Sequence, residues 1–107
     1  MSENYDVPLG KETWDFIPVY GEGKITAHLR QLTVEEYSDC LDRSGLNRIK
    51  IVQYGLIGID GLSIGGEPVT DAAGLHGAKQ DLYKLHMEIW FELYEGATVS
   101  EEEAKNS

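Results

Sequence analysis

The segment 78–95 constrains the fold more than any other part of the chain, because its apolar residues recur at intervals of three and four. This spacing places them on one side of an α-helix. The stripe consists of Leu82, Leu85, Ile89 and Leu93. Charged residues such as Glu88 and Glu92 fall on the opposite side, and Gly96 follows as a natural helix end. The pattern predicts the longest helix of the protein, with one face in the core.

A second apolar stripe runs along the same segment, about a quarter-turn from the first. It consists of Tyr83, Met87, Trp90 and Tyr94. One flat core cannot cover both stripes, which leaves two interpretations. Either the domain surrounds this helix on two sides, with Trp14 and Phe16 as the internal cover, or the second stripe contacts another protein. Because aromatic residues and methionine are enriched at protein interfaces, we treat the four residues as candidate interface residues.

Two stretches near the N-terminus predict a β-hairpin. Residues 14–20 are rich in aromatic and β-branched side chains, and residues 25–30 alternate between apolar and polar. A Gly-Glu-Gly sequence at residues 21–23 lies between them and supplies the turn. Pro18 has no N–H to donate to a β-ladder, so the first strand is expected at an edge of its sheet.

The middle of the chain predicts shorter elements. Thr33 and Glu36 fit a capping box, in which each side chain accepts a hydrogen bond from the backbone N–H of the other, so a helix should begin here and end at Gly45. Residues 46–57 fit either a helix or a buried strand. The length of the segment favours the helix, and the strand stays open as the alternative. Residues 58–66 hold four glycines and predict a turning segment, with a small hairpin around its last two glycines.

A short helical turn capped at Thr70 or Asp71 should precede the long helix. Together these elements predict an α+β fold, in which an N-terminal β-hairpin is followed by two or three helices, the last one long. We expect a flexible arm over residues 1–12, a single globular domain over residues 13–96 and an acidic tail over residues 97–107. The length of 107 residues suits one domain.

The charge balance separates classes of partner. Lys and Arg number 9 against 19 Asp and Glu, so the formal net charge is −10. Such a surface repels phosphate backbones and anionic lipid, which argues against nucleic acid and membranes as partners. A basic protein patch would be attracted, although the charge also serves solubility. The first ten residues lack the apolar core of a signal peptide, and no apolar run approaches the roughly 18 residues of a membrane span, so we expect a cytoplasmic protein.

A search for chemical motifs predicts no catalytic residue, no cofactor and no metal site. The glycine-rich segment lacks the Gly-Lys-Ser/Thr ending of a phosphate loop. His28, His76 and His86 lack the spacing of metal ligands; we expect His28 to be solvated and His86 to be partly buried and hydrogen-bonded. Cys40 falls on the apolar side of its predicted helix, where a cysteine behaves as a small hydrophobe. The sequence therefore predicts a protein that is not an enzyme.

Four segments, taken in order, resemble the tail assembly chaperones of long-tailed bacteriophages. They are the aromatic entry at 14–20, the strand and capped helix at 28–37, the glycine-rich motif at 57–66, and the long helix followed by residues 99–106. The resemblance implies a non-enzymatic protein that binds the tape measure protein while the tail tube polymerises in the host cell cytoplasm, often with self-association. It transfers no functional residue, and the predicted hairpin departs from the largely helical pattern of those chaperones. The alternative is a structural virion component, such as a tail or head-completion subunit; a small enzyme ranks third.

Overall fold

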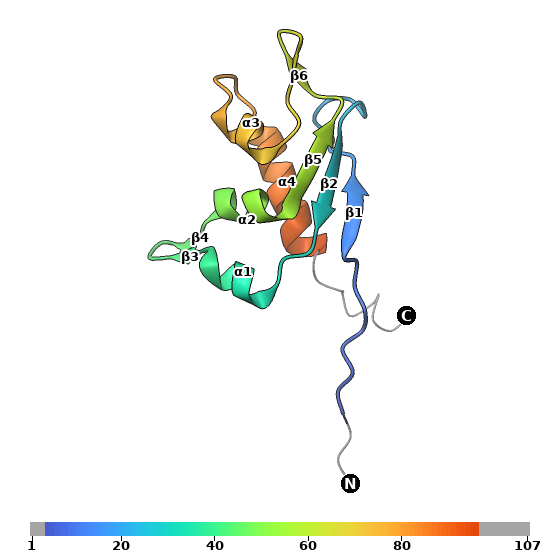
Figure 1. The fold of residues 1–107 in the computed structure, drawn as a ribbon, viewed down its shortest axis with the longest axis vertical. Helices are drawn as coiled ribbons and strands as arrows, with labels where there is room; N and C mark the ends of the chain where they lie inside the picture. Colours follow the sequence, from blue (N-terminus) through green and yellow to red (C-terminus); the bar gives the residue numbers. More distant parts are fainter. Residues whose placement is uncertain (1–3, 97–107) are drawn as a thin grey trace.

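A three-stranded antiparallel sheet is the base of the fold, which the computed structural model describes for residues 4–96 (Figure 1). Its strands lie in the order β1 (Thr13–Phe16), β2 (Thr26–Arg30) and β5 (Leu56–Asp60). The helices of the described part are α1 (Val34–Asp39), α2 (Arg48–Gly55), α3 (Ala72–Gly77) and α4 (Tyr83–Gly96). Two small hairpins pair β3 (Leu41–Asp42) with β4 (Gly45–Leu46) and β6 (Ser63–Ile64) with β7 (Glu67–Pro68). The predicted α+β fold with a long last helix is confirmed, but the described residues contain four helices, where two or three were expected. The expected acidic tail lies outside the described residues.

The predicted N-terminal hairpin is formed by β1 and β2. Asp15 on β1 lies opposite His28 on β2, and their side chains share the outer face of the sheet. β1 is an edge strand, as expected. Pro18 does not belong to the strand, however; it follows β1 and is buried in the loop that connects it to β2. The loop is longer than a tight turn, because the aromatic and β-branched stretch leaves the ladder after Phe16.

Helix α1 begins at the predicted capping box and ends earlier than expected. The Thr33 hydroxyl accepts from the Glu36 N–H, and the Glu36 carboxylate accepts from the Thr33 N–H. The predicted end at Gly45 is wrong, because the β3–β4 hairpin intervenes. Asp42 accepts hydrogen bonds from both the N–H and the hydroxyl of Ser44, each at 2.8 Å. This local turn offers the backbone an alternative to further helix, and Gly45, with φ +115°, belongs to the hairpin.

Residues 46–57, for which helix and strand were both open, contain part of each. Helix α2 accounts for residues 48–55, as the length of the segment favoured, and strand β5 begins immediately at Leu56. β5 then continues through Gly58 to Asp60, so the first part of the predicted turning segment is in fact the third strand of the sheet. The turning segment begins only after Asp60, and its hairpin pairs β6 with β7 around residues 65–66.

Helix α4 begins at Tyr83 rather than at Ala78, the start that the sequence predicted. Ala78 instead caps the end of helix α3. Its backbone is extended, with φ −66° and ψ 138°, so it does not belong to α4. The predicted cap of α3 is confirmed at Asp71, whose carboxylate accepts from the Gly74 N–H at 2.7 Å. Asp81 accepts from the Tyr83 N–H at 3.2 Å and so satisfies a donor at the new start of α4.

The core lies between the inner face of the sheet and the helices. The first stripe is buried as predicted, at Leu85, Ile89 and Leu93 on α4 and at Leu82 just before it. Two glutamates on the side of α4 expected to face solvent instead accept hydrogen bonds from the β1–β2 hairpin and its loop. Glu88 accepts from the backbone N–H groups of Val19 and Tyr20 at 2.8 and 3.0 Å, and Glu92 accepts from the Trp14 indole N–H at 3.1 Å. None of the helices that the structure describes is long and apolar enough to cross a membrane.

Candidate protein-binding face

The second stripe of α4 lies against α2, not against the hairpin. The Arg48 guanidinium sits 4.9 Å from the centre of the Trp90 ring, in cation–π geometry, and one of its N–H groups points at the Met87 sulfur, 4.0 Å away. Trp14, one of the two residues expected to cover this stripe, does not bond to it. Trp14 bonds Glu92 on the other side of α4, because the hairpin packs against that side.

The four predicted interface residues differ in their burial. Tyr83 and Tyr94 expose 62% and 48% of their surface, whereas Met87 and Trp90 are half-buried. Trp90 packs against the core, and its ring stacks on that of Tyr94, with centroids 5.6 Å apart and an angle of 17° between the planes. Trp90 thus anchors the surface from below, and the two tyrosines present it to solvent.

Helix α2 and strand β4 extend this surface with residues that the sequence did not single out. Leu46 and Ile49 are both exposed, and Arg48 connects them to the stripe on α4. We call the combined surface the α2–α4 face; its members are Leu46, Arg48, Ile49, Tyr83, Met87, Trp90 and Tyr94. The sequence held only a weak signal for these residues, because an arginine beside an isoleucine is ordinary at the start of a helix. Nothing near Arg48 in the sequence shows which other helix its side chain will contact.

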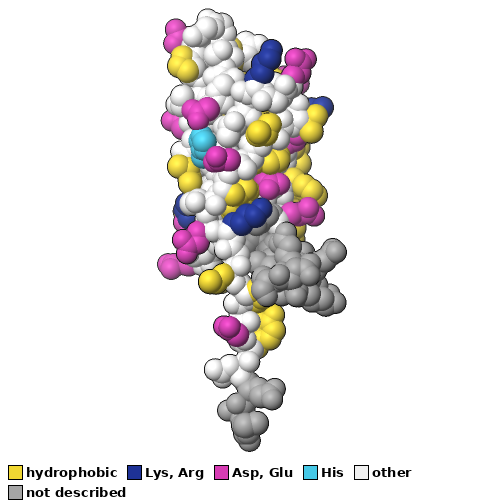
Figure 2. Space-filling model, turned by 90° about the vertical axis from the view of Figure 1, so that its right-hand side faces the viewer, with side chains coloured by type: hydrophobic (Ala, Val, Ile, Leu, Met, Phe, Trp, Pro, Cys, Tyr) yellow, Lys and Arg dark blue, Asp and Glu magenta, His cyan; other side chains and the backbone are white. Residues whose placement is uncertain are grey.

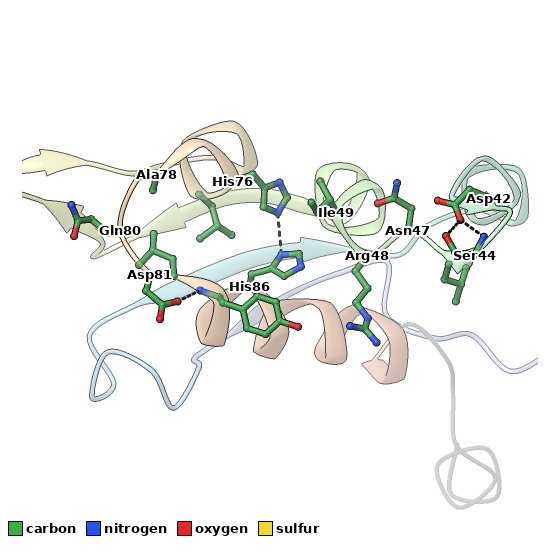
Figure 3. Close-up of a pocket in the computed structure, with 14 residues that line it drawn as sticks. Asp42, Ser44, Asn47, Arg48, Ile49, His76, Ala78, Gln80, Asp81 and His86 are labelled. Carbon is green, nitrogen blue, oxygen red and sulfur yellow. Dashed lines mark hydrogen bonds between the residues drawn. The ribbon is translucent and has the colours of Figure 1, made fainter.

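An open groove of about 670 Å³ runs along one end of the α2–α4 face (Figure 3). It lies between the β3–β4 hairpin, the start of α2, the end of α3 and the start of α4. Leu46, Ile49 and Tyr83 contribute exposed apolar surface, and Leu75 and Leu82 lie buried beneath it. Polar residues also line the groove, namely Asp42, Ser44, Asn47, Arg48, Gln80 and Asp81.

Two histidines meet within the groove lining. His76 on α3 and His86 on α4 point toward one another, with 3.0 Å between His76 Nε2 and His86 Nδ1 (Figure 3). Burial lowers the pKa of both imidazoles, and the charge of Arg48 lowers that of His86 further. Both rings are therefore neutral near pH 7, and one donates to the other. The expectation that His86 is partly buried and hydrogen-bonded is confirmed, with His76 as the unforeseen partner.

His28 lies on the opposite side of the sheet, in a different environment. The sequence indicated a solvated ring, and the side chain is part-exposed, but both ring nitrogens are engaged. Nδ1 lies 2.6 Å from Asp15 and Nε2 lies 2.6 Å from Asp60. These hydrogen bonds, first from Asp60 and then from Asp15, raise the pKa of His28. The His28 ring therefore links the three strands, since Asp15, His28 and Asp60 belong to β1, β2 and β5.

Two further observations concern the cysteine and the metal-ligating side-chain types of the described residues. Cys40 is fully buried, and burial raises the pKa of its thiol, which disfavours the reactive thiolate. Within residues 4–96, no group of three or more His, Cys, Asp and Glu side chains could hold a metal ion. The site that geometry brings together is thus the α2–α4 face with its groove. Comparisons with protein-family models, with curated proteins and with solved structures find no match to this chain.

Proposed function

We propose that this chain is a non-enzymatic phage tail assembly chaperone or accessory protein, which binds other phage proteins during tail morphogenesis in the host cytoplasm. The observation that carries the binding role is the α2–α4 face, where Arg48 stacks on Trp90 beside two exposed tyrosines. The resemblance to tail assembly chaperones supplies the biological setting, with the tape measure protein as the suspected partner.

The composition of the face supports a binding role energetically. Tryptophan, tyrosine and arginine dominate the residues whose removal weakens protein complexes most. Here Trp90 holds the Arg48 guanidinium in place, so less side-chain entropy is lost when a partner binds. The net charge of −10 would speed encounter with a basic partner and repel acidic ones.

Co-expression with the tape measure protein of the same phage tests this proposal. A Tyr83→Ser, Tyr94→Ser double variant removes the exposed part of the face and leaves the half-buried Trp90 in place. We expect the wild-type chain to co-purify with the tape measure protein and the double variant to lose that association. A matched control is Val19→Ser with Ile57→Ser, since both residues are exposed elsewhere on the molecule. Equal co-purification of the face variant and the control would refute the role of the face.

A structural virion component is the second candidate. The observation that favours it is the N-terminal arm, whose exposed apolar side chains would be buried only in an assembly. Mass spectrometry of purified virions separates the two functions. Absence from the particle supports the chaperone, and many copies per particle support the structural subunit.

A further inference from the structure

We propose that the groove at the end of the α2–α4 face binds a segment of a partner protein that has an apolar middle and a lysine or arginine at each end. This inference deepens the proposed protein-binding function and rests on it, because it states the chemistry of the partner at the same surface. The groove itself has an apolar middle, and a carboxylate lies toward each of its ends (Figure 3).

Two aspartates mark the ends of the groove. Asp81 lies toward one end, just before α4, and Asp42 lies toward the other, in the β3–β4 hairpin (Figure 3). Ile49 and His86 lie between them (Figure 3). Both aspartates are exposed, and neither forms an ion pair with another described residue. A partner that carries a cation at each end would therefore meet an unpaired carboxylate at each end of the groove.

Both carboxylates are held in place by hydrogen bonds within their own turns. Asp42 Oδ1 accepts from the N–H and the hydroxyl of Ser44, and Asp81 Oδ1 accepts from the Tyr83 N–H. The bonds from Ser44 also lower the pKa of Asp42, which keeps this carboxylate charged. Because the two groups are positioned before a partner arrives, less conformational entropy is lost when an ion pair forms.

The arginine of the lining is already engaged at the side of the groove. The Arg48 guanidinium sits over the Trp90 ring and points an N–H group at the Met87 sulfur. The paired histidines of the lining are neutral near pH 7. Other basic residues close to the aspartates in the sequence do not belong to the lining, namely Arg43, Lys79 and Lys84. The charge that a bound segment meets at both ends of the groove is therefore negative.

The apolar middle of the groove disfavours a ligand that is charged throughout. Leu46, Ile49 and Tyr83 are exposed along it, and Leu75 and Leu82 lie buried beneath them. Covering this surface with apolar side chains is favourable, because it removes hydrocarbon from water. Lysine and arginine suit the ends, since their methylene stems can lie on apolar surface while the charged group reaches a carboxylate. These contacts together fit an apolar segment with basic ends.

The charge of the whole molecule favours the same partner. The formal net charge is −10, and acidic side chains are spread over the face of the molecule that Figure 2 shows. A field of this sign attracts a basic segment before contact and repels an acidic one. The two carboxylates of the groove would then fix the position of the basic ends.

Synthetic peptides test the inference on the purified full chain. The probe series has a core of alternating leucine and serine, of increasing length, with a pair of lysines at each end. One control series has glutamates in place of the lysines, and another has a core of serine alone. We expect a lysine-ended peptide to shift the NMR signals of the Leu46, Ile49 and Tyr83 amides, with an affinity that falls as salt is raised. Both control series should bind far more weakly.

A charge-removing variant, Asp42→Asn with Asp81→Asn, tests the role of the two carboxylates. Asparagine keeps a side-chain oxygen that can still accept from Ser44 and from the Tyr83 N–H, so the variant should fold, which thermal melts would check. We expect this variant to bind the lysine-ended peptide about 2- to 30-fold more weakly than wild type, because two exposed ion pairs are lost.

The matched control carries Asp6→Asn and Asp71→Asn, which change the net charge equally and lie outside the groove lining. Asp71 caps α3, and asparagine caps a helix as well as aspartate does. We expect the control to bind the lysine-ended peptide like wild type. Equal affinity of the groove variant and the control would overturn the inference. Glutamate-ended or serine-core peptides that bind as tightly as the probe series would overturn it too.

The co-purification assay separates this inference from the proposed function. If no lysine-ended peptide binds at millimolar concentration, yet wild type co-purifies with the tape measure protein, only the groove inference fails. If lysine-ended peptides bind the groove but no tail protein co-purifies with wild type, the tail assembly function fails and the groove inference holds.

Discussion

Gly61 should tolerate no side chain, and Gly23 provides a control with nearly the same backbone. Their φ angles are +83° and +81°, in the left-handed region that strains any other residue. A Cβ at Gly61 would lie 1.9 Å from the carbonyl oxygen of Lys24, whereas a Cβ at Gly23 would meet no atom within 4 Å. The two positions therefore share the backbone strain and differ in the steric overlap.

The cost of each alanine follows from these two contributions. Left-handed backbone costs an alanine about 1–2 kcal/mol at either position. The overlap at Gly61 is with backbone, which cannot rotate away, and shifts forced by overpacking typically cost about 1–3 kcal/mol more. We therefore expect Gly23→Ala to lower the free energy of unfolding by about 1–2 kcal/mol and Gly61→Ala by about 2–5 kcal/mol.

Urea denaturation followed by circular dichroism measures both values. In thermal melts, each kcal/mol should lower Tm by about 4–8 °C for a domain near this size. If the two alanine variants lost the same free energy, the close approach of Gly61 to the Lys24 carbonyl would be refuted. Such a result would also mean that a side chain fits at position 61, directly after β5, without a clash.

Three further predictions concern charged and titrating side chains. Glu88→Ala leaves two backbone N–H groups of the hairpin loop without their acceptor, so it should lower the free energy of unfolding by about 1–3 kcal/mol in urea denaturation; an unchanged midpoint would contradict it. The raised pKa of His28 stabilises the fold fully below about pH 6.5, and that contribution is lost as pH rises through the raised value, so the gap in Tm between wild type and His28→Gln should shrink at alkaline pH. The pH dependence from His86 runs the other way, because its pKa is lowered: stability should fall as pH drops below about 6.5 and the buried pair becomes protonated. An NMR titration should show His28 titrating above that value and His86 below it.

Local signals in the sequence predicted the parts of the fold that depend on neighbours along the chain. The capping box at Thr33 and Glu36 is visible because both partners lie within one helical turn. The buried stripe of α4 is visible because helical spacing alone groups its members. The end of strand β5 at residues 58–60 was missed because Gly58 opens a glycine-rich segment that resembles a turn. Only the pairing with β2 makes this part a strand.

The candidate site was predicted in part, for the same physical reason. Helical spacing identified the aromatic stripe that contains Tyr83 and Trp90, which still forms part of the face. Arg48 comes from another helix, and its contact with Trp90 depends on how α2 crosses α4. The helical pattern predicted a solvent-facing charge at Glu88, because a sequence does not show which carboxylates will accept from a distant loop.

The order of the strands has a consequence for the time course of folding. β1 and β2 can pair as soon as they exist, but a two-stranded hairpin is marginal in water. β5 reaches β2 only after residues 31–55 have been bridged, and α4, which covers the sheet, comes later still. During synthesis, the apolar inner face of β2 at Ala27 and Leu29 has no lasting cover until the segment carrying α4 has left the ribosome. The domain should therefore acquire its structure after translation of that segment, in one late cooperative step, rather than progressively from its N-terminus.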